Sequence, residues 1–246
     1  MTLSPICIGF LFLILRSTLV FGFQRLSKTP WASRHRIDRT SIPLEQEQRE
    51  HSRWFLGMVL DSTLLYFLLS LHVFQFSSQH GFIFIGFLFA HILIVEPVYY
   101  GYHRLLHSHR YLYKHHHIIH HLSVVVQPIT SYTFTFLERL SYTLLFSLPA
   151  ILLNFITGIS LEALFVYYLV FDALNSLGHL NTEIFPDGYQ QSFLKWVLYT
   201  PSFHRQHHKR YIKNYCLFMP IFDKLGGTVC PHTEEVFGQA KQGYKR

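Results

Sequence analysis

Histidines occur at regular spacing in three short motifs of this sequence, HRLLH, HIIHH and HRQHH, and a further histidine lies in NSLGHLN. Residues at i and i+4, or at i, i+3 and i+4, lie on one face of a helix, so each motif can direct two or three imidazoles to the same side. Neutral imidazole offers one nitrogen lone pair and is the commonest side-chain ligand for transition metals. The candidate ligands are His103, His107, His117, His120, His121, His179, His204, His207 and His208.

Nine imidazoles exceed the number that one ion needs. Two metal ions that share them, with positions left open for oxygen or substrate, are the simpler interpretation, because a catalytic metal keeps an open position. A single pair such as His103 and His107 could equally be hydrogen-bonded to its neighbours, but three motifs of matched spacing favour metal binding. A histidine-rich transporter would carry its ligands within the membrane spans, whereas these motifs follow the spans.

The remaining histidines are predicted to play other parts. Three of them lie off the favoured helix faces, where a solvated role or a contact to a ligand is expected, and six are isolated and receive no chemical role. The first set is His109, His115 and His116, and the second is His35, His51, His72, His80, His91 and His232.

Two carboxylates, Glu96 and Asp172, lie at the ends of apolar segments. An unpaired charge there costs a few kcal/mol, so both are expected to have partners. Each could accept an N–H from a metal-bound imidazole and so fix the ring, or could face water and pair with an arginine. Asn175 has the same two interpretations, with a polar contact at a helix end favoured. Asn214, Tyr215 and Asp223 are expected to brace the final histidine helix.

The composition indicates a membrane protein. Half of the residues are hydrophobic, 17% are aromatic and only 14% are charged, which favours long lipid-facing segments. The net charge of +7 comes from short basic runs beside apolar stretches, which are typical of topology signals and not of a nucleic-acid surface. Three widely spaced cysteines support neither a disulfide framework nor a CxxC metal site.

The apolar segments predict how the chain crosses the bilayer. Residues 5–23 form an anchoring helix, since no basic region precedes them as it would in a cleavable signal peptide. Residues 24–53 form a basic cytosolic linker. Residues 54–76 and 82–102 are each about 20 residues, enough for one crossing, and a short polar segment at 77–81 joins them into a hairpin.

A second apolar block, residues 142–172, is divided near Thr157-Gly158 into halves that look short for a full crossing, which predicts a shallow hairpin. Two hairpins bring all the histidine motifs to one face, and the lysines and arginines beside them place that face in the cytosol. We therefore expect an all-α integral membrane protein with about four to five apolar helices and a cytosolic histidine-rich helical cap. Residues 1–53 would form the anchor and linker, and 54–246 the metal-binding domain.

The order HxxxH, HxxHH, HxxHH resembles the fatty acid hydroxylase superfamily of membrane non-haem di-iron proteins, which includes sterol desaturases and C4-methyl sterol oxidases. The flanking sequences EPVYYGYHRLLH, QPITS, NSLGHLN and YTPSFHRQHHKRYIKNYCLFMPIFDKLGGT are similar to the plant very-long-chain aldehyde decarbonylase group of cuticular wax synthesis. The similarity is clearest from Glu96 to Thr228. The superfamily's ligand positions fall on the three histidine motifs, with His179 as a further ligand.

The resemblance implies two iron ions at the endoplasmic reticulum membrane, although zinc can occupy such a site in an isolated or crystallised form. It implies dioxygen as co-substrate, electrons from NADPH through a reductase or cytochrome b5, and a very-long-chain aldehyde or fatty acyl chain as substrate. A fatty acid hydroxylase or C4-methyl sterol oxidase is the enzymatic alternative. The decarbonylases continue into a C-terminal domain, whereas this sequence stops at Arg246. A non-catalytic partner subunit, in a homo- or hetero-oligomer with a full-length relative, is therefore the third expectation.

Overall fold

The computed structural model describes residues 4–74 and 81–243, and this part of the chain consists of helices joined by loops, with a single isolated β-bridge and no strand. Five of its helices are long and apolar enough to cross a membrane, which confirms the predicted all-α membrane fold. They are α1 (Pro5–Leu26), α3 (Leu44–Ser70), α4 (Gly81–Ser108), α7 (Phe136–Thr157) and α8 (Leu161–Gly178).

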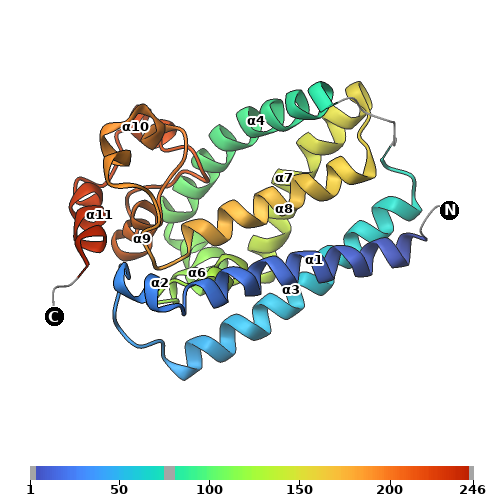
Figure 1. Cartoon of the computed structure of the whole chain (residues 1–246). Helices are drawn as coiled ribbons and strands as arrows, with labels where there is room; N and C mark the ends of the chain where they lie inside the picture. The colour runs from blue at the N-terminus through green and yellow to red at the C-terminus, as the bar shows by residue number, and fades with distance from the viewer. Residues whose placement is uncertain (1–3, 75–80, 244–246) are drawn as a thin grey trace.

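Shorter helices gather at the end of the bundle where α4 and α8 finish, and they form the predicted helical cap (Figure 1). A π-helical turn, η1, immediately precedes α6 and lies in the middle of the histidine-rich stretch. The short elements are α2 (Pro30–Arg34), α5 (Arg110–Leu112), η1 (Tyr113–His117), α6 (Ile118–His121), η2 (Pro128–Tyr132), η3 (Asp187–Gln191), η4 (Phe193–Trp196), α9 (Pro201–Arg210), α10 (Ile221–Leu225) and α11 (Thr233–Gln242).

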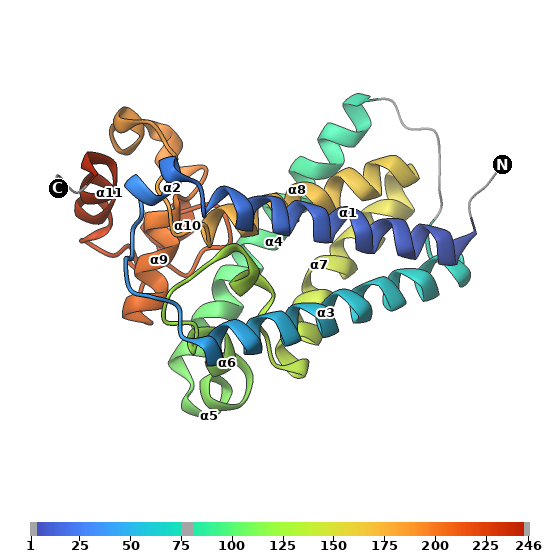
Figure 2. The ribbon, with the colours of Figure 1, turned by 60° about the horizontal axis from the view of Figure 1, so that its bottom comes forward.

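The long helices pack in a bundle in which α1 contacts both α3 and α8, and α4 contacts α7 (Figure 2). Their shared core includes Phe12, Leu65, Leu164 and Tyr167, all buried. The outward faces carry large exposed apolar side chains, for example Phe89. An apolar exterior of this kind is what contact with lipid requires.

The N-terminal region differs from the prediction in how it joins the bundle. Residues 44–53, predicted as the end of a linker, are the first turns of α3, so the predicted boundary at residue 53 falls inside a helix. The helix begins early because Glu50 is buried and accepts hydrogen bonds from Gln46 and Thr130. The division into two domains stays a prediction, and residues 75–80, which include the end of the predicted span and most of the polar connection, lie outside the described residues.

The second apolar block is longer than predicted. Helix α7 starts at Phe136, six residues before the predicted start, and has 22 residues, while α8 has 18. Charged residues in the first turns of α7 hid its start in the sequence, but Glu138 is buried and Arg139 is ion-paired. The predicted turn is correct, since α7 ends at Thr157 and Gly158 follows with φ 66°.

Local sequence signals fix the helix that carries HRQHH. Thr200 caps α9, since its hydroxyl accepts a hydrogen bond from the amide of Phe203 at 3.1 Å, and Pro201 occupies the first helical position. The helix ends at Tyr211, whose φ is 62° and whose amide donates to the carbonyl of His207 at 2.8 Å. These two ends define the ten residues of α9 and so hold its histidines in fixed positions.

A close packing contact at the end of α8 gives a test of the fold. A Cβ at Gly178 would lie 2.0 Å from the hydroxyl oxygen of the buried Tyr199, so we expect Gly178→Ala to lower the free energy of unfolding by about 1–3 kcal/mol. The control is Gly86→Ala in α4, where no atom lies within 4 Å and a gain of about 0.5–1 kcal/mol is expected. Thermal unfolding in detergent measures both, and equal effects would contradict the packing argument.

Candidate metal centre

The nine predicted ligands lie together in two groups at the cap end of the bundle. Within each group, every histidine offers one ring nitrogen that lies within 4.8 Å of the corresponding atoms of the others. The first cluster is His103, His107, His117, His121 and His207. The second cluster is His120, His179, His204 and His208. Helices α4, α6, α8 and α9, together with the turn η1, supply these side chains.

Two of the sequence motifs are divided between the clusters. From HIIHH, His121 belongs to the first cluster and His120 to the second, and from HRQHH, His207 belongs to the first and His208 to the second. The clusters are therefore neighbours: the ring centroids of His121 and His208 are 4.7 Å apart. This placement fits two metal ions side by side.

Hydrogen bonds at Nδ1 fix the tautomers in the first cluster. The Nδ1–H of His103 donates to the carbonyl of Tyr215 at 2.8 Å, and that of His207 donates to the carbonyl of Lys213 at 2.8 Å. The Nδ1–H of His117 donates to the carboxylate of Glu138. A neutral imidazole has one N–H, so in these rings Nε2 carries a lone pair.

These lone pairs face one another. The Nε2 atom of His121 lies 3.0 Å from that of His117 and 3.1 Å from those of His107 and His207, and the Nε2 atoms of His103 and His117 are 3.0 Å apart. Nitrogens bound to one ion at usual distances are about 3 Å apart. The facing lone pairs of His103 and His117 repel unless a cation lies between them, and the Nε2 atoms of all five rings converge, so the first cluster fits a metal ion.

The second cluster also contains buried ring nitrogens that lack a hydrogen-bond partner. The Nδ1–H of His179 donates to the backbone carbonyl of Asn175 at 2.8 Å, so its Nε2 is an acceptor, and the Nε2 of His204 lies 2.9 Å from it. Neither ring nitrogen of the buried His208, nor the Nδ1 of His120, has a hydrogen-bond partner among the described residues. Buried polar atoms are rarely left without a partner, so these nitrogens also fit a metal ion.

Burial keeps the cap imidazoles neutral. For the ligands that lie outside the long helices, desolvation is the largest effect and repulsion between neighbouring imidazolium groups adds to it. The pKa of His179 falls to about 4 because of burial, which a backbone hydrogen bond partly offsets. The pKa values well below the usual 6.5 are those of His117, His120, His121, His204, His207 and His208. At neutral pH these rings are ready to bind a cation.

Glu138 is a candidate functional residue that the sequence reasoning missed. It lies in the first turn of α7, is fully buried, and accepts the hydrogen bond of the ligand His117. The hydroxyl of Thr135 accepts from its amide at 3.1 Å, which sets the start of the helix. A carboxylate that accepts from a ligand imidazole orients the ring and raises its basicity. The available signal was an acidic residue among apolar ones, in FLERL, directly before the predicted apolar block.

Of the two interpretations of Glu96 and Asp172, acceptance from a ligand imidazole is contradicted by the described hydrogen bonds, and pairing with an arginine is confirmed for Asp172. Glu96 accepts instead from the amide of Phe218 at 2.8 Å. Asp172 is bound by the guanidinium of Arg16, a permanently charged and stronger partner from α1. Asn175 does contact a ligand, but through its backbone carbonyl, while its side-chain amide donates to the carbonyl of Phe171 at 3.1 Å.

The loop after α9 holds the two carbonyls that orient His103 and His207. The carboxylate of Asp223 accepts from the amides of Tyr215 and Cys216, each at 2.7 Å. The side chain of Asn214 donates to the carbonyl of Phe203 at 2.8 Å and accepts from the amide of Cys230 at 2.7 Å. Both residues therefore brace the last histidine helix, as the sequence indicated.

Four further histidines of the described residues lie outside the two clusters. His109 and His115 are exposed, and His116 is half-buried. His91 is buried between α4, α7 and α8, where its Nε2 lies 2.9 Å from the carbonyl of Phe146 and 3.1 Å from the hydroxyl of Tyr167. None of these four belongs to either cluster.

Two adjacent imidazole clusters at one end of five apolar helices define a multi-pass membrane protein whose cap can hold two metal ions. The chain belongs to the fatty acid hydroxylase family, whose model matches residues 87–228, more than half of its length. The matched region contains all nine predicted ligands and Glu138.

Curated proteins are similar to this chain over most of its length. The chain is 36% identical to Protein CER1-like 1 of Arabidopsis thaliana over 200 residues, which cover 79% of this chain and 32% of the relative. It is 36% identical to very-long-chain aldehyde decarbonylase GL1-6 of Oryza sativa subsp. indica over 217 residues, which cover 86% and 34%. The chain thus spans about a third of the length of these relatives. No solved structure matches it.

Removal of the Glu138 carboxylate will weaken the first cluster. We expect Glu138→Ala to lower the metal affinity of one of two sites by about 10–100-fold, because the ring of His117 loses the acceptor that orients it. Metal titration against a chelator, with the purified chain in detergent, measures the two sites. Glu162→Ala, which removes an exposed carboxylate of α8, is the control. Unchanged affinity in Glu138→Ala would show that the contact does not support the metal.

Acid will destabilise the metal-free protein. The buried cap imidazoles have folded-state pKa values below their unfolded value of about 6.5, so the unfolded chain binds more protons. The stability that these rings contribute is present above about pH 6.5 and is lost as the pH falls below it. Thermal unfolding with a chelator, from about pH 8 to about pH 5, measures this loss. His208→Gln should reduce the slope, and a melting temperature independent of pH would contradict the expectation.

Proposed function

We propose that this chain is a metal-dependent oxidoreductase that uses dioxygen to modify a long-chain lipid, with two iron ions held by the nine histidines. The observation that supports it most directly is the set of facing Nε2 lone pairs in two adjacent clusters. Membership of the fatty acid hydroxylase family supports oxidative chemistry on a lipid. The rice relatives are very-long-chain aldehyde decarbonylases, which favours a very-long-chain aldehyde as the substrate. The reaction that we propose is that of a deformylating aldehyde oxygenase.

Iron, when bound, would supply the activation of dioxygen and the redox chemistry. The residues of the chain would supply orientation and a dry environment. Glu138 and the backbone carbonyls of Lys213 and Tyr215 hold the Nδ1–H of three ligands and keep their Nε2 atoms directed at the metal. The buried rings remain neutral, so no proton has to leave before they bind.

A lipid can approach the second cluster through a cavity between the long helices. Phe134 lines this cavity and stacks on His120 with ring centroids 5.3 Å apart. Asn175 also lines it, and its carbonyl holds His179. The cavity therefore reaches residues that contact two ligands of the second cluster, which is where the reacting carbon would lie.

The proposal includes the cellular membrane that holds the enzyme and the source of its electrons. Exposed basic side chains surround the histidine motifs, and such residues favour the cytosolic side of a membrane. They are Arg104, Arg110, Lys114, Lys209 and Arg210. We place the enzyme in the endoplasmic reticulum membrane with its cap in the cytosol, where NADPH can supply electrons through a reductase or cytochrome b5.

A fatty acid hydroxylase or C4-methyl sterol oxidase activity is the second candidate, favoured by the description of the matching family. The two candidates use the same ligands and differ in the product. Membranes that express the chain should yield a shortened alkane under the first and a hydroxylated lipid under the second. Activity that requires a co-expressed full-length relative and survives loss of His204 would identify a non-catalytic partner subunit instead.

Iron content and ligand substitution test the proposal. Detergent-purified protein from iron-replete cells should contain two iron ions per chain. We expect His207→Ala in the first cluster and His208→Ala in the second to lose iron and to lower activity by at least ~10²-fold, because each removes a ligand. His232→Ala is the control, since that ring is exposed and lies outside both clusters. Iron-free wild-type protein with full activity would overturn the proposal.

A further inference from the structure

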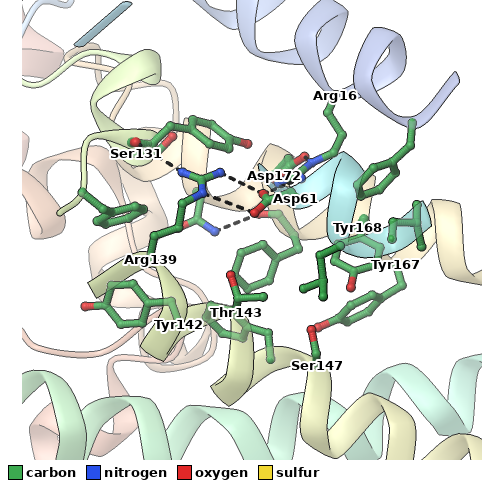
Figure 3. A pocket seen from close by; sticks show the side chains of 18 of the residues that line it. Arg16, Asp61, Ser131, Arg139, Tyr142, Thr143, Ser147, Tyr167, Tyr168 and Asp172 are labelled. Atoms are coloured by element: carbon green, nitrogen blue, oxygen red, sulfur yellow. Dashed lines mark hydrogen bonds and ion pairs between the residues drawn. The ribbon is translucent and has the colours of Figure 1, made fainter. Parts of the chain in front are cut away.

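The cavity that approaches the second cluster has an unusual wall. It lies between α1, α3, α7 and α8, encloses about 870 Å³ of space, part of it open at the mouth, and is lined largely by apolar and aromatic side chains such as Phe12, Leu68 and Phe171 (Figure 3). Four charged side chains interrupt this lining, one from each of the four helices. We call them the charged quartet: Arg16, Asp61, Arg139 and Asp172.

The quartet is a continuous network of ion pairs. The guanidinium of Arg16 donates to both carboxylate oxygens of Asp172 and, through Nη1, to Asp61 at 2.8 Å. Arg139 donates to Asp61 from Nε at 3.2 Å and from Nη2 at 2.8 Å. Figure 3 shows the two guanidinium groups converging on the carboxylates above Thr143 and Ser147. Two positive and two negative charges leave the quartet neutral.

Charged residues within apolar helices are costly and usually functional. A purely structural network would tie the four helices together and satisfy every donor. The quartet does tie them, but the two guanidinium groups carry five N–H each, and the hydrogen bonds described within the structure engage six of these. Four of the ten N–H groups, on two side chains that line the cavity, therefore have no acceptor among these hydrogen bonds.

The quartet lies at a defined distance from the metal centre. Asp172 and His179 are seven residues apart on α8 and its C-terminal cap, which corresponds to about 10 Å along the helix axis. Asn175 lies between them and lines the same cavity. A chain that occupies the cavity would pass from the quartet to the second cluster.

We propose that the charged quartet binds a hydroxyl or carbonyl group of the lipid substrate, about 10 Å along α8 from the second cluster. The inference rests on the proposed function, which places the reacting end of the lipid at the second cluster. It adds a second oxygen-bearing group, farther along the lipid, to the expected substrate. A neutral group is favoured over an ionised carboxylate, because an extra charge would be left without a counter-charge among apolar helices. A saturated chain with no such group would leave the spare N–H donors facing hydrocarbon.

Lipid binding to metal-free protein tests this proposal separately from catalysis. The probes are a long-chain alkane and the same chain with one secondary hydroxyl group, each with a terminal diazirine for photocrosslinking to the full chain in detergent. We expect the hydroxylated probe to bind about tenfold more tightly, the scale of one hydrogen bond to a charged group. Its crosslinks should fall in α7 and α8. Equal binding of the two probes would overturn the proposal.

Substitutions test whether the charged quartet causes the tighter binding of the hydroxylated probe. The double variant Asp61→Asn/Arg139→Gln keeps the quartet neutral and should abolish the preference while alkane binding is unchanged. If it unfolds, Gly57→Ala serves instead, because a Cβ there would lie 2.0 Å from Nη1 of Arg139 and would displace the guanidinium. Glu50→Gln, a buried carboxylate of α3 outside the cavity, is the control. A preference that survives displacement of Arg139 would refute the assignment.

The experiments distinguish failure of the proposed enzymatic function from failure of the proposal for the charged quartet. If the chain holds no iron and forms no oxidised product, yet still prefers the hydroxylated probe, the quartet is a lipid site in a protein with another role. If iron and product are present but the two probes bind equally, the enzymatic proposal stands and the quartet is structural.

Discussion

The site depends on the orientation of imidazole rings that are held at Nδ1. Two backbone carbonyls of the loop after α9, together with the carboxylate of Glu138, accept the Nδ1–H groups of three ligands. The Nε2 lone pairs then face one another at 3.0–3.1 Å, an arrangement that is repulsive until positive charge lies among them. The bundle, the cap and the loop that follows α9 all serve to keep those rings in place.

The spans, the helix faces that carry the histidines and the turn between α7 and α8 could be predicted from the sequence, because each depends on residues close together in the chain. Hydropathy over about 20 residues identified the spans, and i, i+3, i+4 spacing identified the imidazoles that share a helix face. The turn at Gly158 followed from the special conformation that glycine permits. The family resemblance and the histidine spacing pointed to the same nine residues, and the fold brings them to one end of the bundle.

The remainder depends on contacts between distant residues, which spacing cannot supply. His120 and His121 are consecutive and point about 100° apart on a helix, so the cluster that each joins depends on where the other helices place their histidines; His207 and His208 are divided in the same way. Glu138 is 21 residues from His117, and Arg16 is 156 residues from Asp172. Contacts between separate elements thus decide the role of Asp172, which the sequence analysis left open, and of Glu138, which it did not single out.

The division of the short helices α6 and α9 between both clusters links the two halves of the centre mechanically. An ion bound in one half would immobilise the helices that carry histidines of the other, so part of the ordering cost of a second ion would already be met. Loading should therefore be cooperative, with singly occupied chains scarce at equilibrium. An exchange of the ion on one side would, by the same linkage, alter affinity on the other.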